Sequence, residues 1–252
     1  MIEAKKPVQY IRDPEMYRIV KNSIHGGMVF VNKRHEKSNF SEMIEYDKAS
    51  PTKHILFCDV NSLYSYALRL PLPIDDFAFM TMEEIHNFDV MEIPVDGSRG
   101  YLVTADISIP NALHDMLDKM PPAPERIFLS PQELSQGQRQ LIEEFKSVIS
   151  HPLRTEKLIL NLYDKKEYTV HHKTLQTYIR LGARLGKIHS VISFTQNPNF
   201  RDYVDFVISE RIQAADEVTK LIKTLQLNSL YGAVGRDKAR EINLQIKFSF
   251  SA

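Results

Sequence analysis

The stretch FCDVNSLYSYALRLPLP, from Phe57 to Pro73, joins an apolar run to a helical pattern. The residues HILFC at 54–58 favour a short buried strand that ends at Asp59. A helix of two turns is then predicted by apolar residues at i, i+3, i+4 and i+7, namely Leu63, Tyr66, Ala67 and Leu70. Pro71 ends that helix. The carboxylate of Asp59 is therefore either the N-cap of the new helix or a metal ligand at the strand end.

Composition sets broad limits. The 252 residues allow one or two domains with a buried core, and 43% hydrophobic with 25% charged residues is typical of a soluble globular protein. The formal net charge is +0, so only a local basic groove would favour nucleic acid. The single cysteine, Cys58, excludes an intrachain disulfide and a cysteine-based zinc cluster. Without an apolar stretch of membrane length or a signal peptide, we expect a reducing, intracellular setting and no membrane partner.

Strand and helix patterns are mixed without regular alternation, which predicts an α+β fold. Residues 12–24 are predicted to be helical, 28–31 to be a strand, and KLILNL with EYTVHH, at 157–172, to form a hairpin. Six Lys or Arg residues between 165 and 187 accompany one acid, Glu167, so this segment either follows a DNA backbone or forms a solvated helix face. Neighbouring His171 and His172 point to opposite faces of a strand, which disfavours a shared metal.

A second stretch, KLIKTLQLNSLYG at 220–232, ends a region from about Asp202 to Tyr231 that is predicted to be helical almost throughout. On it, one polar and aromatic face within an arc of roughly 100° gathers Lys220, Thr224, Asn228 and Tyr231. The buried stripe is predicted at Val218, Leu221, Ile222 and Leu225. Gly232 either ends the helix as a cap or allows a backbone or a base to approach closely. An ordinary amphipathic helix with a glycine cap explains this stretch taken alone.

Both stretches contain NSLY, at Asn61–Tyr64 and at Asn228–Tyr231, about 165 residues apart. Together they resemble motifs A and B of family B DNA polymerases, which read D-x-x-S-L-Y-P and K-x-x-x-N-S-x-Y-G. Motif A is Asp59–Tyr64 here, with Ser65 in place of the proline. Over about residues 10–235 the chain is similar to the protein-primed polymerases of Maverick/Polinton transposons and related viruses and plasmids.

The resemblance implies part of a polymerase right hand, with a palm sheet portion and helical fingers. It places a linker with a Gly-Gly element at 1–50, palm with motif A at 51–160, fingers with motif B at 161–235, and a divergent tail at 236–252. The implied activity is template-directed dNTP addition in protein-primed DNA replication, at a nuclear or a virus- or transposon-associated location. Two alternatives are a decayed or domesticated module that binds DNA or nucleotide without catalysis, and an unrelated α+β interaction protein.

The resemblance also implies roles for residues. Asp59 would be catalytic and, with the Val60 carbonyl, would bind Mg²⁺ in a two-metal site. Tyr64, under the deoxyribose, would exclude a 2′-hydroxyl. The residues that would contact the incoming nucleotide are Leu63, Tyr64, Arg211, Lys220, Asn228 and Tyr231. Those that would contact template or primer DNA are Gly26, Gly27, Ser229 and Gly232. The partners would be template and primer DNA, dNTP and a terminal protein primer.

The chain departs from the family pattern in several places. Thr224 stands where motif B has its lysine, while Lys223 lies one residue away and Lys220 one turn back. Ile24 stands where the family's Y-x-G-G-like element has tyrosine, and the sequence contains no Y-x-D-T-D motif C, exonuclease domain or thumb. A single carboxylate cannot hold two Mg²⁺ ions, so we expect no primer extension by this chain alone. Both a truncated gene copy and a piece of a longer protein agree with this pattern.

Overall fold

The computed structural model of the chain describes residues 8–26, 28–31, 33, 35–146 and 155–236. It divides into two compact units. Of the described residues, the smaller unit comprises 58–74 and 196–236, and the larger comprises those between 8 and 57 and between 75 and 195. Both predicted motifs, Asp59–Tyr64 and Asn228–Gly232, belong to the smaller unit. The palm at 51–160 and the fingers at 161–235 were expected from resemblance to functional regions of polymerases. Their boundaries stay a prediction.

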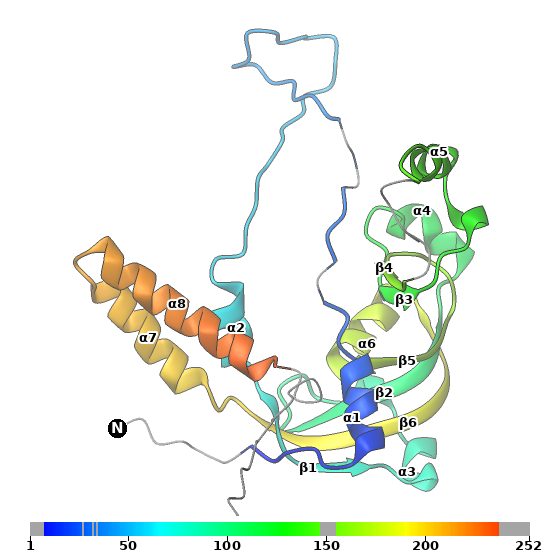
Figure 1. The fold of residues 1–252 in the computed structure, drawn as a ribbon, viewed down its shortest axis with the longest axis vertical. Coiled ribbons are helices and arrows are strands. Elements are labelled where there is room, and N and C mark those ends of the chain that lie inside the picture. Colours follow the sequence, from blue (N-terminus) through cyan, green and yellow to red (C-terminus); the bar gives the residue numbers. More distant parts are fainter. Residues whose placement is uncertain (1–7, 27, 32, 34, 147–154, 237–252) are drawn as a thin grey trace, which may run out of the picture. The chain divides into compact units, whose positions relative to one another are not determined.

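The main sheet has four strands in the order β1-β6-β2-β5. Their bounds are β1 Leu72–Phe79, β2 Arg99–Ser108, β5 Lys165–His171 and β6 Arg184–Asn197, and β2 is antiparallel to both β5 and β6 (Figure 1). Because successive side chains of a strand point to opposite faces, β2 and β6 supply two cores. The mixture of this sheet with helices confirms the α+β class.

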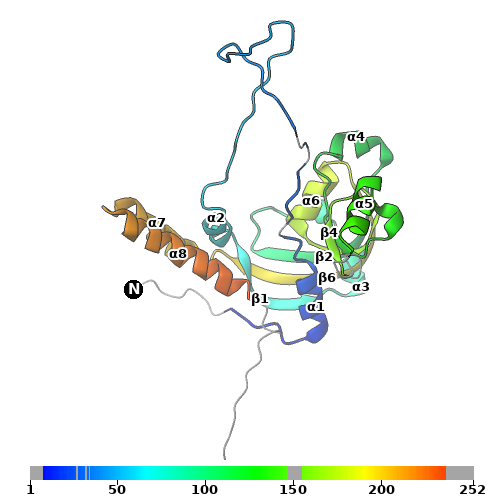
Figure 2. The same cartoon turned by 45° about the horizontal axis from the view of Figure 1, so that its top comes forward.

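Two helices cover the sheet, α6 (His172–Arg180) and α1 (Pro14–Asn22) (Figure 2). Leu175 of α6 belongs to one buried cluster with Val103, Val170 and Val191 of the sheet. Met16 and Ile19 of α1 belong to another with Leu102, Ile192 and Phe194. The helix predicted at 12–24 is thus confirmed as α1, which starts behind its N-cap Asp13.

The remaining elements of the larger unit are short. They are α3 Met82–His86, η1 Val90–Glu92, η2 Asn111–Leu113, α4 His114–Leu117, β3 Glu125–Ile127, η3 Pro131–Glu133, α5 Gln136–Glu144 and β4 Lys157–Ile159. Strand β4 pairs with β3, whereas β5 pairs with β2. The hairpin predicted at 157–172 is therefore wrong, because its two strands pair with β3 and β2 and not with each other.

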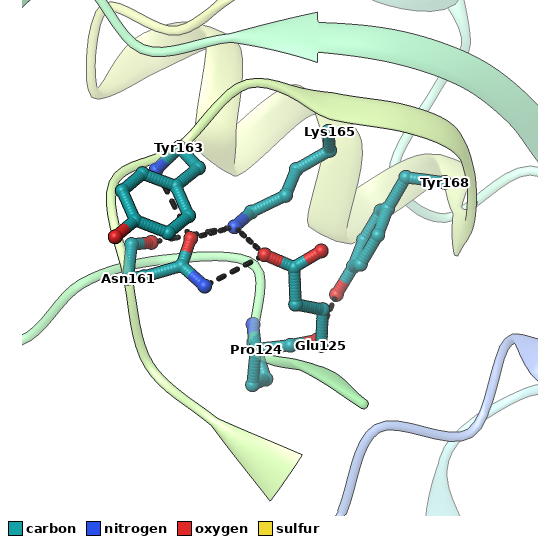
Figure 3. Close-up of polar contacts among 6 residues, drawn as sticks. All are labelled: Pro124, Glu125, Asn161, Tyr163, Lys165 and Tyr168. Carbon is teal, nitrogen blue, oxygen red and sulfur yellow. Dashed lines mark hydrogen bonds and ion pairs between the residues drawn. The ribbon is translucent and has the colours of Figure 1, made fainter. Parts of the chain in front are cut away.

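A buried lysine joins the β3–β4 ribbon to β5. Lys165 is fully buried, and its Nζ lies 2.6 Å from Oε1 of Glu125 and also contacts the side-chain oxygen of Asn161 (Figure 3). Burial lowers the pKa of Lys165, and the carboxylate of Glu125 opposes that shift. Lys166 pairs with Asp106. Lys165 is therefore committed to contacts within the fold, whereas the Lys166 side chain is 77% exposed. The alternative that this segment follows a DNA backbone stays a prediction.

The His171–His172 pair also differs from the sequence prediction. His171 ends β5 and caps α6, and His172 begins that helix, so the two rings are 4.3 Å apart instead of on opposite faces. Burial, followed by the nearby charges of His172 and Lys173, lowers the pKa of His171 to about 3. Burial also lowers the pKa of His172, and both histidines pack at the start of α6 as part of the fold.

The smaller unit is built from three helices, α2 (Leu63–Arg69), α7 (Arg201–Gln213) and α8 (Glu217–Val234) (Figure 2). Their common core consists of Leu68, Val204, Val207 and Leu227. Arg69 on α2 pairs with Asp205 on α7, with 2.7 Å between Nε and Oδ1. This packing fixes the face that α8 turns inward. No helix among the described residues is long and apolar enough to cross a membrane.

Two sequence predictions about burial are wrong. Residues 54–58 form an exposed extended segment without a strand ladder, in which Phe57 is 97% exposed, and residues 29–31 are exposed as well. The stripe at Val218, Leu221, Ile222 and Leu225 is 53–67% exposed. On α8 the inward residue is Leu227, because α2 and α7 pack on that side.

Candidate functional site

Two tyrosines bring motif A and motif B together. The rings of Tyr64 on α2 and Tyr231 on α8 are stacked, with centroids 4.2 Å apart and an angle of 11° between their planes. Both side chains remain partly exposed. The two NSLY stretches, distant in sequence, therefore present one aromatic pair on the surface of the smaller unit.

The start of α2 is strained and lies next to a cation. Ser62, the N-cap residue, has a φ of 54°, a left-handed conformation that is rare outside glycine. Its hydroxyl accepts a 3.5 Å hydrogen bond from Nη1 of Arg211 on α7. Strain of this kind is found at binding and catalytic sites. Arg211 and motif A thus meet in the same unit as the tyrosine pair.

Asp59 lies three residues before Ser62 and is exposed, as are Val60 and Leu63. Because Ser62 is the N-cap of α2, the alternative that Asp59 caps this helix is wrong. The carboxylate is left open to solvent and available to a ligand.

The polar face of α8 carries the other expected contacts. Asn228 and Ser229 are exposed. Lys220 pairs with Glu217 at 2.7 Å and thereby lowers the pKa of that carboxyl. Lys223 lies on a different face and pairs with Glu210 of α7 at 3.7 Å. Lys220 is therefore the lysine that shares a helix face with Tyr231.

Comparison with known proteins identifies the family. The chain matches the family described as "DNA polymerase type B, organellar and viral" over residues 1–247. The chain belongs to the type B DNA polymerases. In fold it is similar to Phi29 DNA polymerase in an orthorhombic crystal form, with a TM-score of 0.50 and 14% identity over 92% of this chain and 33% of that chain.

A second Phi29 DNA polymerase structure, complexed with primer-template DNA and incoming nucleotide substrates, gives a TM-score of 0.45 and 15% identity over 90% of this chain and 32% of that chain. The chain thus spans about a third of the length of the solved polymerases that it matches. No curated protein matches it.

At the position of the motif B lysine, this polymerase chain has a hydroxyl that is already engaged. Thr224 Oγ1 donates a 2.9 Å hydrogen bond to the carbonyl of Lys220, one turn earlier in α8. A hydroxyl that bonds its own helix offers no positive charge to a phosphate. This residue is the clearest departure of the site from the family pattern.

Gly232 lies inside α8, which continues to Val234 and has Gly235 as its C-cap. The alternative that Gly232 ends the helix is therefore wrong. An added Cβ would meet no atom within 4 Å, and the backbone is helical. Neither packing among the described residues nor backbone conformation requires glycine at this position.

Type B polymerases generally use divalent metal ions. The donors here suit Mg²⁺ in kind, because the Asp59 carboxylate and the Val60 carbonyl are both oxygens. Within the described ranges, no group of three or more His, Cys, Asp or Glu side chains is placed to hold a metal.

The Gly-Gly element belongs to the larger unit. Gly26 is exposed, with free space around an added Cβ, whereas Gly27 lies outside the described residues. The sequence reasoning assigned no role to His25 beside it. The ring of His25 stacks on Tyr168, and its Nε2 lies 2.9 Å from the carbonyl oxygen of Thr169. In the sequence, only the position of His25 directly before Gly26 and Gly27 indicated that it could have a role.

Proposed function

We propose that this chain forms the nucleotide-binding part of a template-directed DNA polymerase. The observation that carries the proposal is the stack of Tyr64 on Tyr231, which joins motif A to motif B in one unit. Arg211, at the side of Ser62, adds a guanidinium near the same helix start. An aromatic pair beside a cation suits a ligand with a flat base, a sugar and phosphates.

Each residue has a role in the proposal. Arg211 binds the triphosphate, since a guanidinium fork matches phosphate oxygens. Tyr64 lies under the deoxyribose and leaves no room for a 2′-hydroxyl. Tyr231 and Asn228 line the pocket of the incoming and templating bases. Ser229 and Gly232 let the template strand approach α8.

The metal belongs to the proposal as well. Asp59 and the Val60 carbonyl would hold Mg²⁺, with the Leu63 backbone close to the triphosphate. When bound, divalent ions in this chemistry activate the primer hydroxyl and stabilise the leaving pyrophosphate. The proposed partners are primer-template DNA, dNTP and, by resemblance to the protein-primed polymerases, a terminal protein primer.

Replacing Thr224 tests whether this face of α8 meets a triphosphate. Thr224→Lys restores the family's cation, so we expect it to tighten binding of fluorescently labelled dATP about tenfold in the presence of Mg²⁺. The matched control is Leu225→Lys, which adds the same charge on the exposed stripe of the same helix. Equal effects of the two lysines, or no effect of either, would contradict the proposed face.

A further inference from the structure

His25 ties the segment before Gly26 to the sheet by two contacts. Its ring lies flat on that of Tyr168, with centroids 4.4 Å apart and 10° between the planes. Its Nε2 lies 2.9 Å from the Thr169 carbonyl oxygen, 144 residues along the chain. Because a carbonyl only accepts hydrogen bonds, the proton of the ring is on Nε2.

The partners of His25 are themselves held in place. Tyr168 is buried, and its hydroxyl donates a 3.0 Å hydrogen bond to the Pro124 carbonyl (Figure 3). Thr169 is also buried, and its hydroxyl lies 2.9 Å from that of Thr104 on β2. A ring fixed to these two residues is therefore fixed to the sheet.

The attachment point is the edge of the sheet. In the order β1-β6-β2-β5, strand β5 is the last, and edge strands present unpaired backbone groups. His25 gives the Thr169 carbonyl a donor. The N-terminal side of the segment is held separately, since α1 ends at Asn22 and its Met16 and Ile19 are buried against the other core residues.

Gly26 follows His25 directly, and the Cα atoms of neighbouring residues are about 3.8 Å apart. The position of His25 therefore restricts that of Gly26. Gly26 itself is exposed and has open space on its Cβ side. The anchored histidine thus presents an unobstructed glycine at the edge of β5.

We propose that His25 is the positioning residue of Gly26, and that it holds Gly26 at this edge of the sheet for contact with DNA. The inference rests on the proposed function, because that function is what gives Gly26 a DNA contact.

The test measures the affinity of the chain for fluorescent primer-template DNA by anisotropy at one fixed salt concentration. His25→Ala removes the stack and the hydrogen bond, and we expect about tenfold weaker binding. His25→Gln keeps an N–H donor and His25→Phe keeps the ring, so each recovers part of the affinity. The control His86→Ala, at an exposed histidine of α3, leaves binding unchanged.

A double-mutant cycle separates positioning from simple loss of stability. Gly26→Ala fits the folded chain, so a loss of DNA affinity in this variant reports a clash with DNA. If His25 positions Gly26, that loss disappears in the His25→Ala background. Additive losses in the double mutant would overturn the inference. Unchanged binding in His25→Ala, His25→Gln and His25→Phe would overturn it as well. In both cases a loss of affinity in Gly26→Ala would still support the proposed DNA contact. If the unmodified chain does not bind DNA, the proposed function fails first.

Discussion

Gly232 shows how a single residue can distinguish a structural from a functional purpose. Glycine inside a helix is less stable than alanine by about 1 kcal/mol, and α8 has room for the extra methyl group. We therefore expect Gly232→Ala to raise the free energy of unfolding by about 1 kcal/mol and to weaken DNA binding, since the methyl group occupies the space of the template. Thermal unfolding and fluorescence anisotropy measure the two effects.

Gly137 provides the control for that substitution. It lies in α5, and an added Cβ there also meets nothing within 4 Å. Gly137→Ala should stabilise the chain to a similar degree without any change in DNA affinity. If Gly232→Ala binds DNA as well as the Gly137 variant does, the role given to Gly232 is wrong.

For single residues, the sequence predicted that Tyr64 and Tyr231 belong to one site, but it did not predict the contacts that the site residues make. Tyr64 and Tyr231 were paired through resemblance alone, because no local pattern links residues so far apart. Thr224 was recognised as a departure, while the hydrogen bond that commits its hydroxyl to Lys220 depends on the helix itself. His25 was missed, since its partners Tyr168 and Thr169 are distant in sequence.

Among the elements, periodicity predicted helices better than the faces they bury. The helix at 217–234 exists, but its apolar stripe with Leu221 and Leu225 is exposed, while the side that carries Leu227 is buried. A helical pattern identifies a possible contact face, and only the neighbouring helices decide which face is covered. The buried strand predicted at 54–58 is wrong for a similar reason, because an apolar run forms a strand only when it pairs with another strand.

Lys165 and Tyr168 of β5 both contact the chain at β3, and the ion pair of Lys165 with Glu125 is the buried one (Figure 3). Lys165→Met leaves Glu125 without its cation and removes one of the two donors to Oδ1 of Asn161, the other being the backbone N–H of Tyr163. We therefore expect the free energy of unfolding to fall by about 3 kcal/mol. Denaturant unfolding measures the loss. The control Lys166→Met removes a neighbouring lysine whose side chain is 77% exposed, and it should cost less than about 1 kcal/mol. Similar losses in both variants would show that the buried pair is not special.

For the whole molecule, the resemblance predicted the functional motifs, whereas the local sequence patterns predicted the fold class. The resemblance to type B polymerases anticipated that Asp59–Tyr64 and Asn228–Gly232 belong together, and both lie in one unit. The α+β class followed from mixed local patterns. The strand order β1-β6-β2-β5 did not, because pairing between distant segments leaves no periodic signal in either of them.

The central claim is that motifs A and B form one site that selects deoxyribonucleotides. The most direct measurement is the ratio of the dissociation constants of ATP and dATP in the presence of Mg²⁺, for the unmodified chain, Tyr64→Val and Tyr64→Phe. We predict that the unmodified chain and Tyr64→Phe, which keeps the ring, favour dATP about tenfold, since relief of such a clash is worth about 1–3 kcal/mol. Tyr64→Val should bind both nucleotides equally. An unmodified chain without preference, or a preference that persists in Tyr64→Val, would contradict the account.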